Sequence, residues 1–518
     1  MKEIELKLLV ARGELGALRR RIGTVAEGRP KRRQLRTIYL DTADEALAAG
    51  GVALRLRQAG RSWTQTVKRG RSLRAGLSET EEIDVPAPGG RVDLAALPAP
   101  LAAEIARLTG GLPLAPRYET VVARTTWEAE IGGGRVEIAL DDGEVVAGER
   151  REPILELEIE RLEGAPQAIF AIARTIFPAG PLRFSRANKA ARGRRVAAGE
   201  PAVRPPAPVH AGDPGVAPDA TAEAAAVAIL AECAGQVAAN IVAVTAHDDA
   251  EGPHQLRVGL RRLRAAARLL APALGDGGPR PTGRLAAIEA EARWLAGEVS
   301  RLRDLQVARG DLVAPAAAAT PGETGFEALD RALADAVVAE RAALVATLAG
   351  ARVTGFVLDL AEYIALRGWL DPADHAQTAR LATPFASLAG TAARRAEAKA
   401  ARKARGIAGL EHEARHELRK ALKMLRYIVE FGAPAWPAKR TTAFVKALKG
   451  LQTLFGALND AAMAEALFLT EGGPGADDPT AQRAAGRLIG ASNAAADHVW
   501  AEAVARWDAF AATKRPWA

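Results

Sequence analysis

The 518-residue chain is poor in cysteine, and Cys233 is its single thiol. One cysteine cannot form an intramolecular disulfide, which argues against a disulfide-stabilised secreted protein and favours a reducing compartment. The alanine-rich, helix-like surroundings of Cys233 are typical of a small buried side chain rather than of a reactive thiol. We therefore expect a cytoplasmic protein.

Signatures of membrane proteins and of common enzyme classes are also missing. We find no uncharged apolar run near the ~18 residues of a membrane-spanning helix, and Met1 to Val10 is too charged for a signal peptide. The chain lacks a phosphate loop of the type G-x-x-x-x-G-K followed by serine or threonine. No serine or cysteine has a convincing nucleophile context. We therefore expect neither a membrane protein nor a P-loop nucleotidase.

Negative charge is in the minority. The chain has 70 lysines and arginines against 62 acids, which gives a formal net charge of +8 and a pI of about 9.7. Such a balance points to polyanionic partners such as nucleic acid, phosphate polymers or anionic lipid. The length is too great for one hydrophobic core, so two or three domains are expected.

A proline-rich segment divides the chain into two parts. Ala197 to Pro218 contains six prolines and three glycines without strand or helix periodicity, which is typical of a semi-rigid linker. Alternating strand patterns precede it, whereas helical spacing follows it, as in Thr221 to Val244 and Leu285 to Leu305. We predict an α+β multidomain protein with a β-rich domain over residues 1–197, a linker over 198–219 and an all-α bundle over 220–512.

The opening segment Glu3-Ile4-Glu5-Leu6-Lys7 alternates charged and apolar residues. On a strand, Glu3, Glu5 and Lys7 would share one face, because side chains alternate with period 2. Two carboxylates can hold a hard divalent cation, and a lysine beside them can hold an anion, a combination that suits a metal-bound phosphate chain. An amphipathic edge strand with a solvated face is the alternative.

Later segments repeat this alternation. The charged or polar positions that share a face within each segment are Arg55 and Arg57; Thr64, Thr66 and Lys68; Arg135, Glu137 and Asp141; and Glu156, Glu158 and Glu160. Solvent explains one polar face on a sheet, but dense charge of both signs on several strands suits a barrel with these faces inward. The lumen would then hold an acidic patch for metal and a basic lining for phosphoryl oxygens.

Residues 1–197 resemble the CYTH domains, also called triphosphate tunnel metalloenzymes. The resemblance rests on the opening motif and, in order, on Tyr39 to Thr42, Leu54 to Arg57, Thr66 to Lys68, Thr120 and Arg124 before Trp127, Glu137 to Asp141, Leu155 to Glu158, and Asn188-Lys189 with Arg192-Gly193. It implies an antiparallel eight-stranded β tunnel barrel with flanking helices. It also implies hydrolysis or cyclisation of triphosphate-containing substrates with Mg²⁺ or Mn²⁺.

The resemblance implies a role for each matched residue. The metal ligands would be Glu3, Glu5, Asp141, Glu156 and Glu158. The phosphate-binding residues would be Lys7, Arg55, Arg57, Lys68, Arg124 and Lys189. Glu3, Glu5, Lys7, Glu156 and Glu158 would form the catalytic set, with the general base left open. Two positions depart from the family pattern: Thr80 replaces a common arginine, and Asn188 replaces a serine before the lysine.

The C-terminal part contains an internal repeat at an offset of 162 residues. His254, Arg257, Arg261 and Arg264 recur as His416, Arg419, Lys423 and Arg426. Steps of 3 and 4 keep each set on one face of a helix. We call these sets the first basic stripe, which continues to Arg268, and the second basic stripe, which is flanked by Lys420. In each copy a cation, Arg293 or Lys449, lies 11 residues before an aspartate, Asp304 or Asp460.

Same-sign neighbours on a helix repel unless a counter-ion meets them. A surface helix of an arginine-rich protein remains the alternative for either stripe alone, but the duplication favours two tandem, pseudo-symmetric helical repeats with an anion-binding face. Metal binding by His254 and His416 is disfavoured, because neither has a cysteine or carboxylate at ligand spacing. Binding of nucleic acid is disfavoured, because the stripes lack interleaved aromatic residues for base stacking.

Residues 220–510 resemble the CHAD domains, helical modules linked to binding inorganic polyphosphate. The matches are the two basic stripes, Arg303-Asp304, Asn459-Asp460 and Leu425-Arg426-Tyr427. The residues expected to bind polyphosphate are His254, Arg257, Arg261, Arg264, Arg293, His416, Arg419, Lys420, Lys423, Arg426 and Lys449. A CYTH domain followed by a CHAD domain is a recurrent arrangement, and association with polyphosphate granules in the cytoplasm is expected.

Together these features predict metal-dependent hydrolysis of inorganic triphosphate to pyrophosphate and phosphate, with Mg²⁺ or Mn²⁺ orienting water for in-line attack. Three alternatives stay open. The tunnel could be an adenylate cyclase or a thiamine triphosphatase, or the chain could be a non-catalytic polyphosphate-binding protein. The oligomeric state is not predicted.

Overall fold

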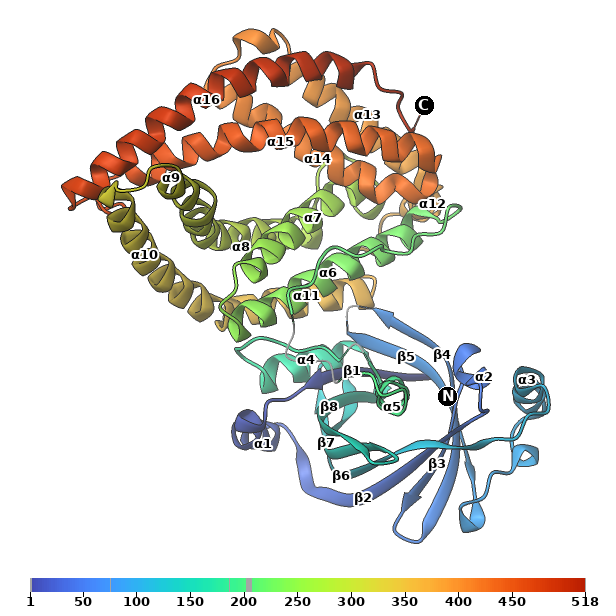
Figure 1. Ribbon diagram of the computed structural model, residues 1–518. Coiled ribbons are helices and arrows are strands. Elements are labelled where there is room, and N and C mark those ends of the chain that lie inside the picture. Colours follow the sequence, from blue (N-terminus) through green and yellow to red (C-terminus); the bar gives the residue numbers. More distant parts are fainter. Residues whose placement is uncertain (1, 75, 186, 202–206, 518) are drawn as a thin grey trace. The chain divides into compact units, whose positions relative to one another are not determined.

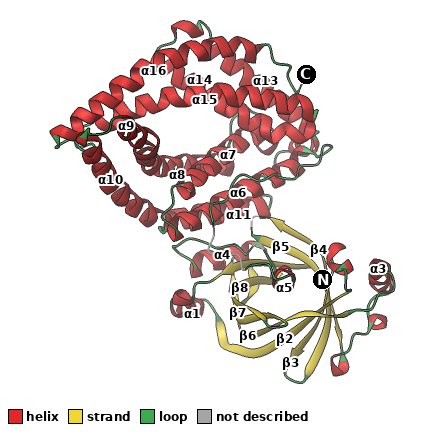
Figure 2. Cartoon of the chain, in the orientation of Figure 1, coloured by secondary structure: helices red, strands yellow, loops and turns green. Residues whose placement is uncertain are grey.

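The computed structural model describes residues 2–74, 76–185, 187–201 and 207–517. The chain forms two compact units, which are considered separately below. The first comprises Met1–Ala207 with Ala349–Gly368, and the second comprises Pro208–Leu348 with Trp369–Ala518. Strands lie in the first unit and the long helices lie mostly in the second (Figures 1 and 2).

The first unit is built on a closed antiparallel barrel of eight strands, which confirms the predicted fold. Around the barrel the strands are β1 (Lys2–Leu9), β5 (Leu77–Pro86), β4 (Ser62–Arg74), β3 (Ala53–Ala59), β2 (Glu27–Asp41), β6 (Ala115–Ile131), β7 (Gly134–Ala147) and β8 (Arg150–Gly164). The closed sheet has no unpaired edge strand.

Strand alternation decides which side chains line the lumen. The pairing of β1 with β8 opposes Lys7 and Glu158, and the pairing of β7 with β8 opposes Asp141 and Glu156. The apolar residues between them face outward and are fully buried, as Leu157 and Ile159 are on β8. The helix α4 (Gln167–Ile176) packs against β6, β7 and β8 on this outer side. Each fully buried aliphatic or aromatic side chain contributes about 1.5–3 kcal/mol, so this packing holds the charged face inward.

Other helices cover the remaining parts of the barrel. Apolar residues of β2, β3 and β4 pack with those of α2 (Ala46–Ala49) and α3 (Ala99–Thr109) in one core cluster. The helix α1 (Leu15–Gly23) contacts α4. The helix α5 (Lys189–Ala197) places Val196 against Val122, Val145 and Ile154. Gly193 of α5 lies so close to the ring of Tyr118 that a Cβ would stand 2.1 Å from it, so this contact requires glycine.

The first unit also contains a helix that lies far along the chain. The helix α11 (Ala351–Ala365) contacts α4 and β4. Arg174 of α4 donates hydrogen bonds to Asp359 at 2.6 Å and to Glu362 at 2.5 Å, and the Thr354 hydroxyl donates to the Gly180 carbonyl at 2.8 Å. The predicted boundaries at residues 197 and 220 did not anticipate this excursion of residues 349–368 out of the helical part of the chain.

The second unit is helical. Its elements are α6 (Ala222–Ala246), α7 (Glu251–Leu274), α8 (Gly283–Val307), a π-helical turn (Ala308–Val313), α9 (Ala314–Ala319), α10 (Thr324–Leu348), α12 (Gln377–Ala382), α13 (Phe385–Lys403), α14 (His412–Gly432), α15 (Ala438–Phe468) and α16 (Pro479–Ala511). The series α6-α7-α8 and α13-α14-α15 each pack in chain order, and α7 contacts α14. The two basic stripes lie on α7 and α14, at corresponding places in the two series.

The helix α6 is long and apolar enough to cross a membrane by length and composition alone, which the sequence prediction did not anticipate. However, 67% of its most apolar window is buried within the protein. Cys233 is fully buried in α6, and burial raises the pKa of its thiol, as expected for a structural cysteine. These observations fit a core helix.

Candidate functional site

One wall of the barrel lumen is a compact network of six buried or half-buried charged groups. Lys189 Nζ lies 2.7 Å from Asp141 and 2.8 Å from Glu158, and it also contacts Glu156. Arg124 binds Asp141 through two hydrogen bonds of 2.7 Å and reaches Glu158 at 2.5 Å. Lys7 Nζ lies 2.6 Å from Glu158 and 3.0 Å from Glu5. Three cations therefore neutralise Asp141, Glu156 and Glu158. We call these six groups the compensated wall: Lys7, Arg124, Lys189, Asp141, Glu156 and Glu158.

The cations of the compensated wall keep Asp141 and Glu158 ionised. Burial alone would raise the pKa of Asp141, but Lys189 and Arg124 hold that pKa at about 2. Burial opposes ionisation of Glu158 as well, and Lys189, Lys7 and Arg124 lower its pKa well below the usual range. The pKa of Lys7 is raised in turn by Glu158 and Glu5, against the effect of burial. Asp141, Glu158 and Lys7 are therefore charged at neutral pH.

The remaining cations line β3 and β4. Arg55 Nη2 lies 2.7 Å from Glu82, and Lys68 Nζ lies 2.7 Å from Glu82 and 2.5 Å from Glu3. Burial would raise the pKa of Glu82, but Arg55 and Lys68 lower it to about 2. The buried Nε of Arg55 has no hydrogen-bond acceptor among the described residues. A buried donor without an acceptor can donate its hydrogen bond to an anionic ligand that enters the lumen.

Arg57 differs from the other lumenal cations because it donates a hydrogen bond of 3.3 Å to a neutral group, the Thr37 hydroxyl. Burial, together with the neighbouring charges of Arg55 and Arg124, lowers the pKa of Arg57 to about 10. An arginine whose charge is this poorly compensated is stabilised by any anion that enters the lumen.

Excess negative charge gathers where β1 and β8 meet. Burial and the neighbouring Glu5 raise the pKa of Glu3 to about 7. Burial, Glu3 and Glu5 raise the pKa of Glu160 to about 8. Glu5 and Glu160 face each other directly in the strand pairing. Glu3 and Glu5 contact Lys68 at 2.5 Å and Lys7 at 3.0 Å, respectively, and both lysines are shared with other acids. Acids therefore outnumber cations here, and a divalent cation would relieve their repulsion.

The acids fit a hard divalent metal. Ligand oxygens of Asp141, Glu156 and Glu158 lie within 4.8 Å of one another. The buried Oε2 of Glu156 accepts no hydrogen bond within the described ranges. All-oxygen carboxylate sets are what Mg²⁺ and Mn²⁺ prefer. Because these acids are paired with Lys7, Arg124 and Lys189, a metal ion would bind well only when an anion takes over the three cations.

The structure places all the predicted tunnel residues in the lumen of one barrel: Glu3, Glu5, Lys7, Arg55, Arg57, Lys68, Arg124, Asp141, Glu156, Glu158 and Lys189. Their individual roles stay predictions. Sequence reasoning gave no role to Glu82 or Glu160. The sequence pattern that could have placed Glu160 in the lumen is the alternation of charged and apolar residues on β8. The same alternation on β5 could have placed Glu82 there.

The two departures from the family pattern have different structural consequences. Asn188 caps α5, because its side chain accepts a hydrogen bond of 2.8 Å from the Ala191 backbone N–H. This cap fixes the start of the helix from which Lys189 enters the lumen. Thr80 is buried and lies 3.5 Å from the Ser78 hydroxyl, so the lumen holds a neutral hydroxyl where an arginine is common.

In the helical unit, the two basic stripes converge. Arg261 of α7 donates a hydrogen bond of 3.3 Å to the Tyr427 hydroxyl of α14. Lys423 of α14 has its pKa lowered to about 6, first by burial and then by Arg419, Arg261, Arg257 and Arg426. A lysine can be affected by four arginines from two helices only if they lie around it. We call this group of five the cation cluster: Arg257, Arg261, Arg419, Lys423 and Arg426.

Acids from neighbouring helices neutralise the stripes in part, which sequence reasoning missed. Arg257 lies 3.0 Å from Asp304 of α8. Glu289 of α8 is shared by Arg268, Arg293 and Arg264 at 2.8, 3.2 and 3.9 Å. Glu430 lies 3.8 Å from both Arg426 and Lys449, and Lys420 pairs with Glu417 instead.

The partial compensation leaves unused donors. The buried Nε atoms of Arg264 and Arg426 have no hydrogen-bond acceptor within the described part of the chain. Burial and Arg303 lower the pKa of His254, so its imidazole is neutral at physiological pH. The side chains of Asn459 and Asp460 lie outside the described residues. The cation cluster therefore contains an unused donor on Arg426, and the first basic stripe carries a second one on Arg264.

Two protein-family models match this chain: the CYTH domain over residues 1–193 and the CHAD domain over residues 228–469. An inorganic triphosphatase of Haemophilus influenzae is 32% identical over 160 residues, which cover 30% of this chain and 44% of that relative. The match thus spans less than half of the relative's length.

Two solved structures are among the matches to this chain. The crystal structure of the CHAD domain of the plant Ricinus communis matches with a TM-score of 0.51 and 26% identity, covering 60% of this chain and 98% of that one. A putative adenylyl cyclase from Hippeastrum, described as having a dominant triphosphatase activity, matches with a TM-score of 0.28 and 22% identity, covering 39% of this chain and 98% of that one.

Proposed function

The chain carries a CYTH domain fused to a CHAD domain, and from this premise we propose that its barrel hydrolyses inorganic triphosphate to pyrophosphate and phosphate with Mg²⁺ or Mn²⁺. The observation that carries the proposal is the lumen itself, where buried acids and cations occur in nearly matched sets. A metal-bound triphosphate presents the same two kinds of charge, so it can replace the internal pairs one by one.

The cations would hold the phosphate chain. Lys7, Arg124 and Lys189 face it from one wall, and Arg55, Arg57 and Lys68 face it from β3 and β4. As these cations turn to phosphoryl oxygens, the acids of the compensated wall and the acidic group of Glu3 and Glu5 become available as ligands. The bound metal would supply neutralisation of developing charge and orientation of water for in-line attack.

The substrate is tested by a phosphate-release assay with inorganic triphosphate, ATP and thiamine triphosphate, each with and without Mg²⁺ or Mn²⁺. We expect metal-dependent release of phosphate from inorganic triphosphate at the highest kcat/KM. Formation of cyclic AMP from ATP would instead identify a cyclase. A preference for thiamine triphosphate would identify a thiamine triphosphatase. If no substrate is turned over, the chain would be a non-catalytic polyphosphate-binding protein.

Removing Arg57 should lower activity without lowering stability. Because Arg57 is poorly compensated in the free protein, it gains most when an anion binds. We expect Arg57→Ala to lower kcat/KM by on the order of 10²-fold, the scale for losing one preorganised charged donor. The melting temperature should stay constant or rise, because removal relieves repulsion from Arg55 and Arg124. Steady-state kinetics measures kcat/KM, and calorimetry of the protein without ligand measures the melting temperature.

Arg36→Ala is the matched control for this prediction. Arg36 precedes Thr37 on β2, so it faces the outside of the barrel, where it forms an exposed pair with Glu119 at 2.7 Å. Its kcat/KM should stay at the wild-type value. A wild-type kcat/KM for Arg57→Ala would show that Arg57 does not hold the substrate.

We further propose that the cation cluster of the CHAD domain binds inorganic polyphosphate. The support is the convergence of both stripes around Lys423, together with the buried Nε donors of Arg264 and Arg426. Each bound phosphate would displace counter-ions, so affinity should fall steeply with salt, as it does for other linear polyanions.

This proposal predicts that polyphosphate binding takes up a proton at Lys423. The free protein holds the Lys423 pKa at about 6, because of burial and of Arg257 and Arg261 on α7 and Arg419 and Arg426 on α14. A bound polyanion raises that pKa. Uptake should therefore approach one proton at pH 8 and vanish at pH 5, and affinity should fall as pH rises above about 6. Calorimetry in buffers of different ionisation enthalpy measures the uptake.

Lys423→Arg is the informative control, because an arginine stays protonated in both states. It should bind polyphosphate at pH 8 at least as tightly as the wild type and without this proton uptake. Equal uptake by both proteins would assign the proton to a group other than Lys423.

A further inference from the structure

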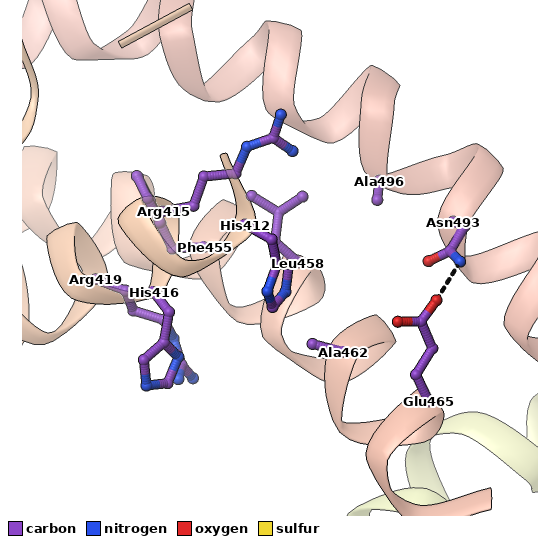
Figure 3. Close-up of a pocket in the computed structure, with 10 residues that line it drawn as sticks. All are labelled: His412, Arg415, His416, Arg419, Phe455, Leu458, Ala462, Glu465, Asn493 and Ala496. Atoms are coloured by element: carbon purple, nitrogen blue, oxygen red, sulfur yellow. Dashed lines mark hydrogen bonds between the residues drawn. The ribbon is translucent and has the colours of Figure 1, made fainter. Parts of the chain in front are cut away.

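A pocket of about 220 Å³ lies between α14, α15 and α16 of the helical unit (Figure 3). One side is formed by His412, Arg415, His416 and Arg419, which are spaced to share one face of α14. His416 and Arg419 also begin the second basic stripe. The pocket therefore extends this stripe past His416 toward the helix start at His412.

The opposite side of the pocket is closed by groups of another kind. Figure 3 shows Glu465 of α15 and Asn493 of α16 on the other side of the pocket from the α14 residues, and the Asn493 amide donates a 2.5 Å hydrogen bond to Glu465. Phe455 and Leu458 supply apolar surface between the two sides. A carboxylate and apolar side chains do not stabilise a polyanion that continues through them. An anionic chain lying along the stripe would end here.

The cationic side is held in place. The guanidinium of Arg415 lies 4.3 Å from the ring centre of Trp500, and its Nε donates a 2.7 Å hydrogen bond to the Leu410 carbonyl. The first backbone N–H groups of α14 add partial positive charge at the same end of the helix. Two guanidinium groups, two imidazoles and a helix start thus face a space that one end of an anion can enter.

We propose that this pocket binds a terminal phosphoryl group and anchors a polyphosphate chain on the basic stripe by its end. The inference rests on the proposed polyphosphate binding and adds recognition of the chain end. A terminal phosphoryl group has three outer oxygens and a charge of about −1.5 to −2 at neutral pH, like that of a phosphate monoester. An internal unit has two outer oxygens and a single charge. The end of a polyphosphate chain and the γ-phosphoryl group of a nucleoside triphosphate share this chemistry.

The test compares long polyphosphate chains with free ends and the same chains with both ends capped as alkyl phosphoramidates. Binding to the full-length protein is measured with EDTA present, so that the chains are not hydrolysed. We expect free-ended chains to bind about 10-fold more tightly, the scale of one charge-assisted hydrogen bond. The difference should vanish in His412→Ala, and in Ala496→Phe, which fills the pocket.

His498→Ala is the matched control, because His498 is exposed on α16 and does not line the pocket. It should keep the wild-type preference for free ends. Any binding of chain ends in the barrel is the same in all these proteins and cancels between them. An equal affinity of the wild type for capped and free-ended chains would overturn the inference, as would a preference for free ends that survives in both pocket variants.

The same measurements separate this inference from the function on which it rests. If capped chains bind and free ends add nothing, polyphosphate binding stands and end recognition fails. If neither chain binds at low salt, the proposed polyphosphate function itself fails. Cyclic trimetaphosphate has no terminal phosphoryl group, so competition by it for the His412-dependent binding would also overturn the inference. Competition by ATP would identify nucleoside triphosphates as a second source of the terminal phosphoryl group. If ATP does not compete, the end of a polyphosphate chain is the ligand of the pocket.

Discussion

We expect Glu5→Gln to abolish metal-dependent triphosphate hydrolysis while the barrel stays folded. Glu5 is buried in the lumen, lies 3.0 Å from Lys7 and opposes Glu160 across the strand pair. The amide keeps the shape but removes a ligand charge from the part of the lumen where negative charge is in excess. The loss of kcat should be on the order of 10³-fold or more, the scale for removing a group that controls transition-state charge.

Stability should respond in the opposite sense, because replacing Glu5 relieves the repulsion that raises the pKa of Glu3 and Glu160. Activity as a function of Mg²⁺ concentration, together with a thermal melt, measures both effects. Glu81→Gln is the matched control, because Glu81 neighbours the lumenal Glu82 but pairs with Arg69 on the other face of the sheet. Turnover near the wild-type rate at limiting Mg²⁺ would show that Glu5 is not a ligand.

The second large effect is expected from reversing charge in the cation cluster. Arg261→Glu combined with Lys423→Glu places one acid on each stripe, among Arg257, Arg419 and Arg426. These arginines would pair with the new acids, so the helices should stay packed while the cluster loses its positive excess. We expect at least a 100-fold loss of polyphosphate affinity at low salt and a shallower salt dependence, because fewer counter-ions are released.

The full-length protein is the proper material for this measurement. A fragment that begins at residue 220 would carry α11 without the barrel elements against which it packs. Lys439→Glu with Lys446→Glu changes the net charge equally at exposed positions of α15 and should leave affinity unchanged. Triphosphate hydrolysis should be unaffected in both double variants. Equal polyphosphate affinity of wild type and cluster variant would leave the stripes as surface charge without this role.

Much of the barrel could be predicted because its information is local. Strand alternation alone separates Arg55 and Arg57 from Leu54 and Leu56, and the structure places the two pairs on opposite faces. The position of the acids relative to the cations could not be predicted in this way. It depends on register between strands, such as Lys7 opposite Glu158, which no single segment encodes.

The helical half shows the same division between local and distant information. The spacing of each stripe is visible along one helix, and it predicts a basic face. The acids that meet these faces, Asp304 and Glu289, come from α8, and their pairing depends on how α7 and α8 pack. The pocket beside His412 was invisible to sequence reasoning for the same reason, since Glu465 and Asn493 come from two other helices.

Because residues 349–368 belong to the first unit, the proline-rich linker is not the sole connection between the two units. The chain passes between the two units at residues 207–208, returns at 348–349 and passes again at 368–369. Three covalent connections, rather than one hinge, therefore join them. A protease that cuts within residues 198–219 should leave both pieces together under native conditions, held by two uncut crossings and by the packing of α11 on α4. The helix α11 thus belongs to the barrel unit by its contacts and to the helical half by its place in the chain, so it would tie the two pieces together after such a cut.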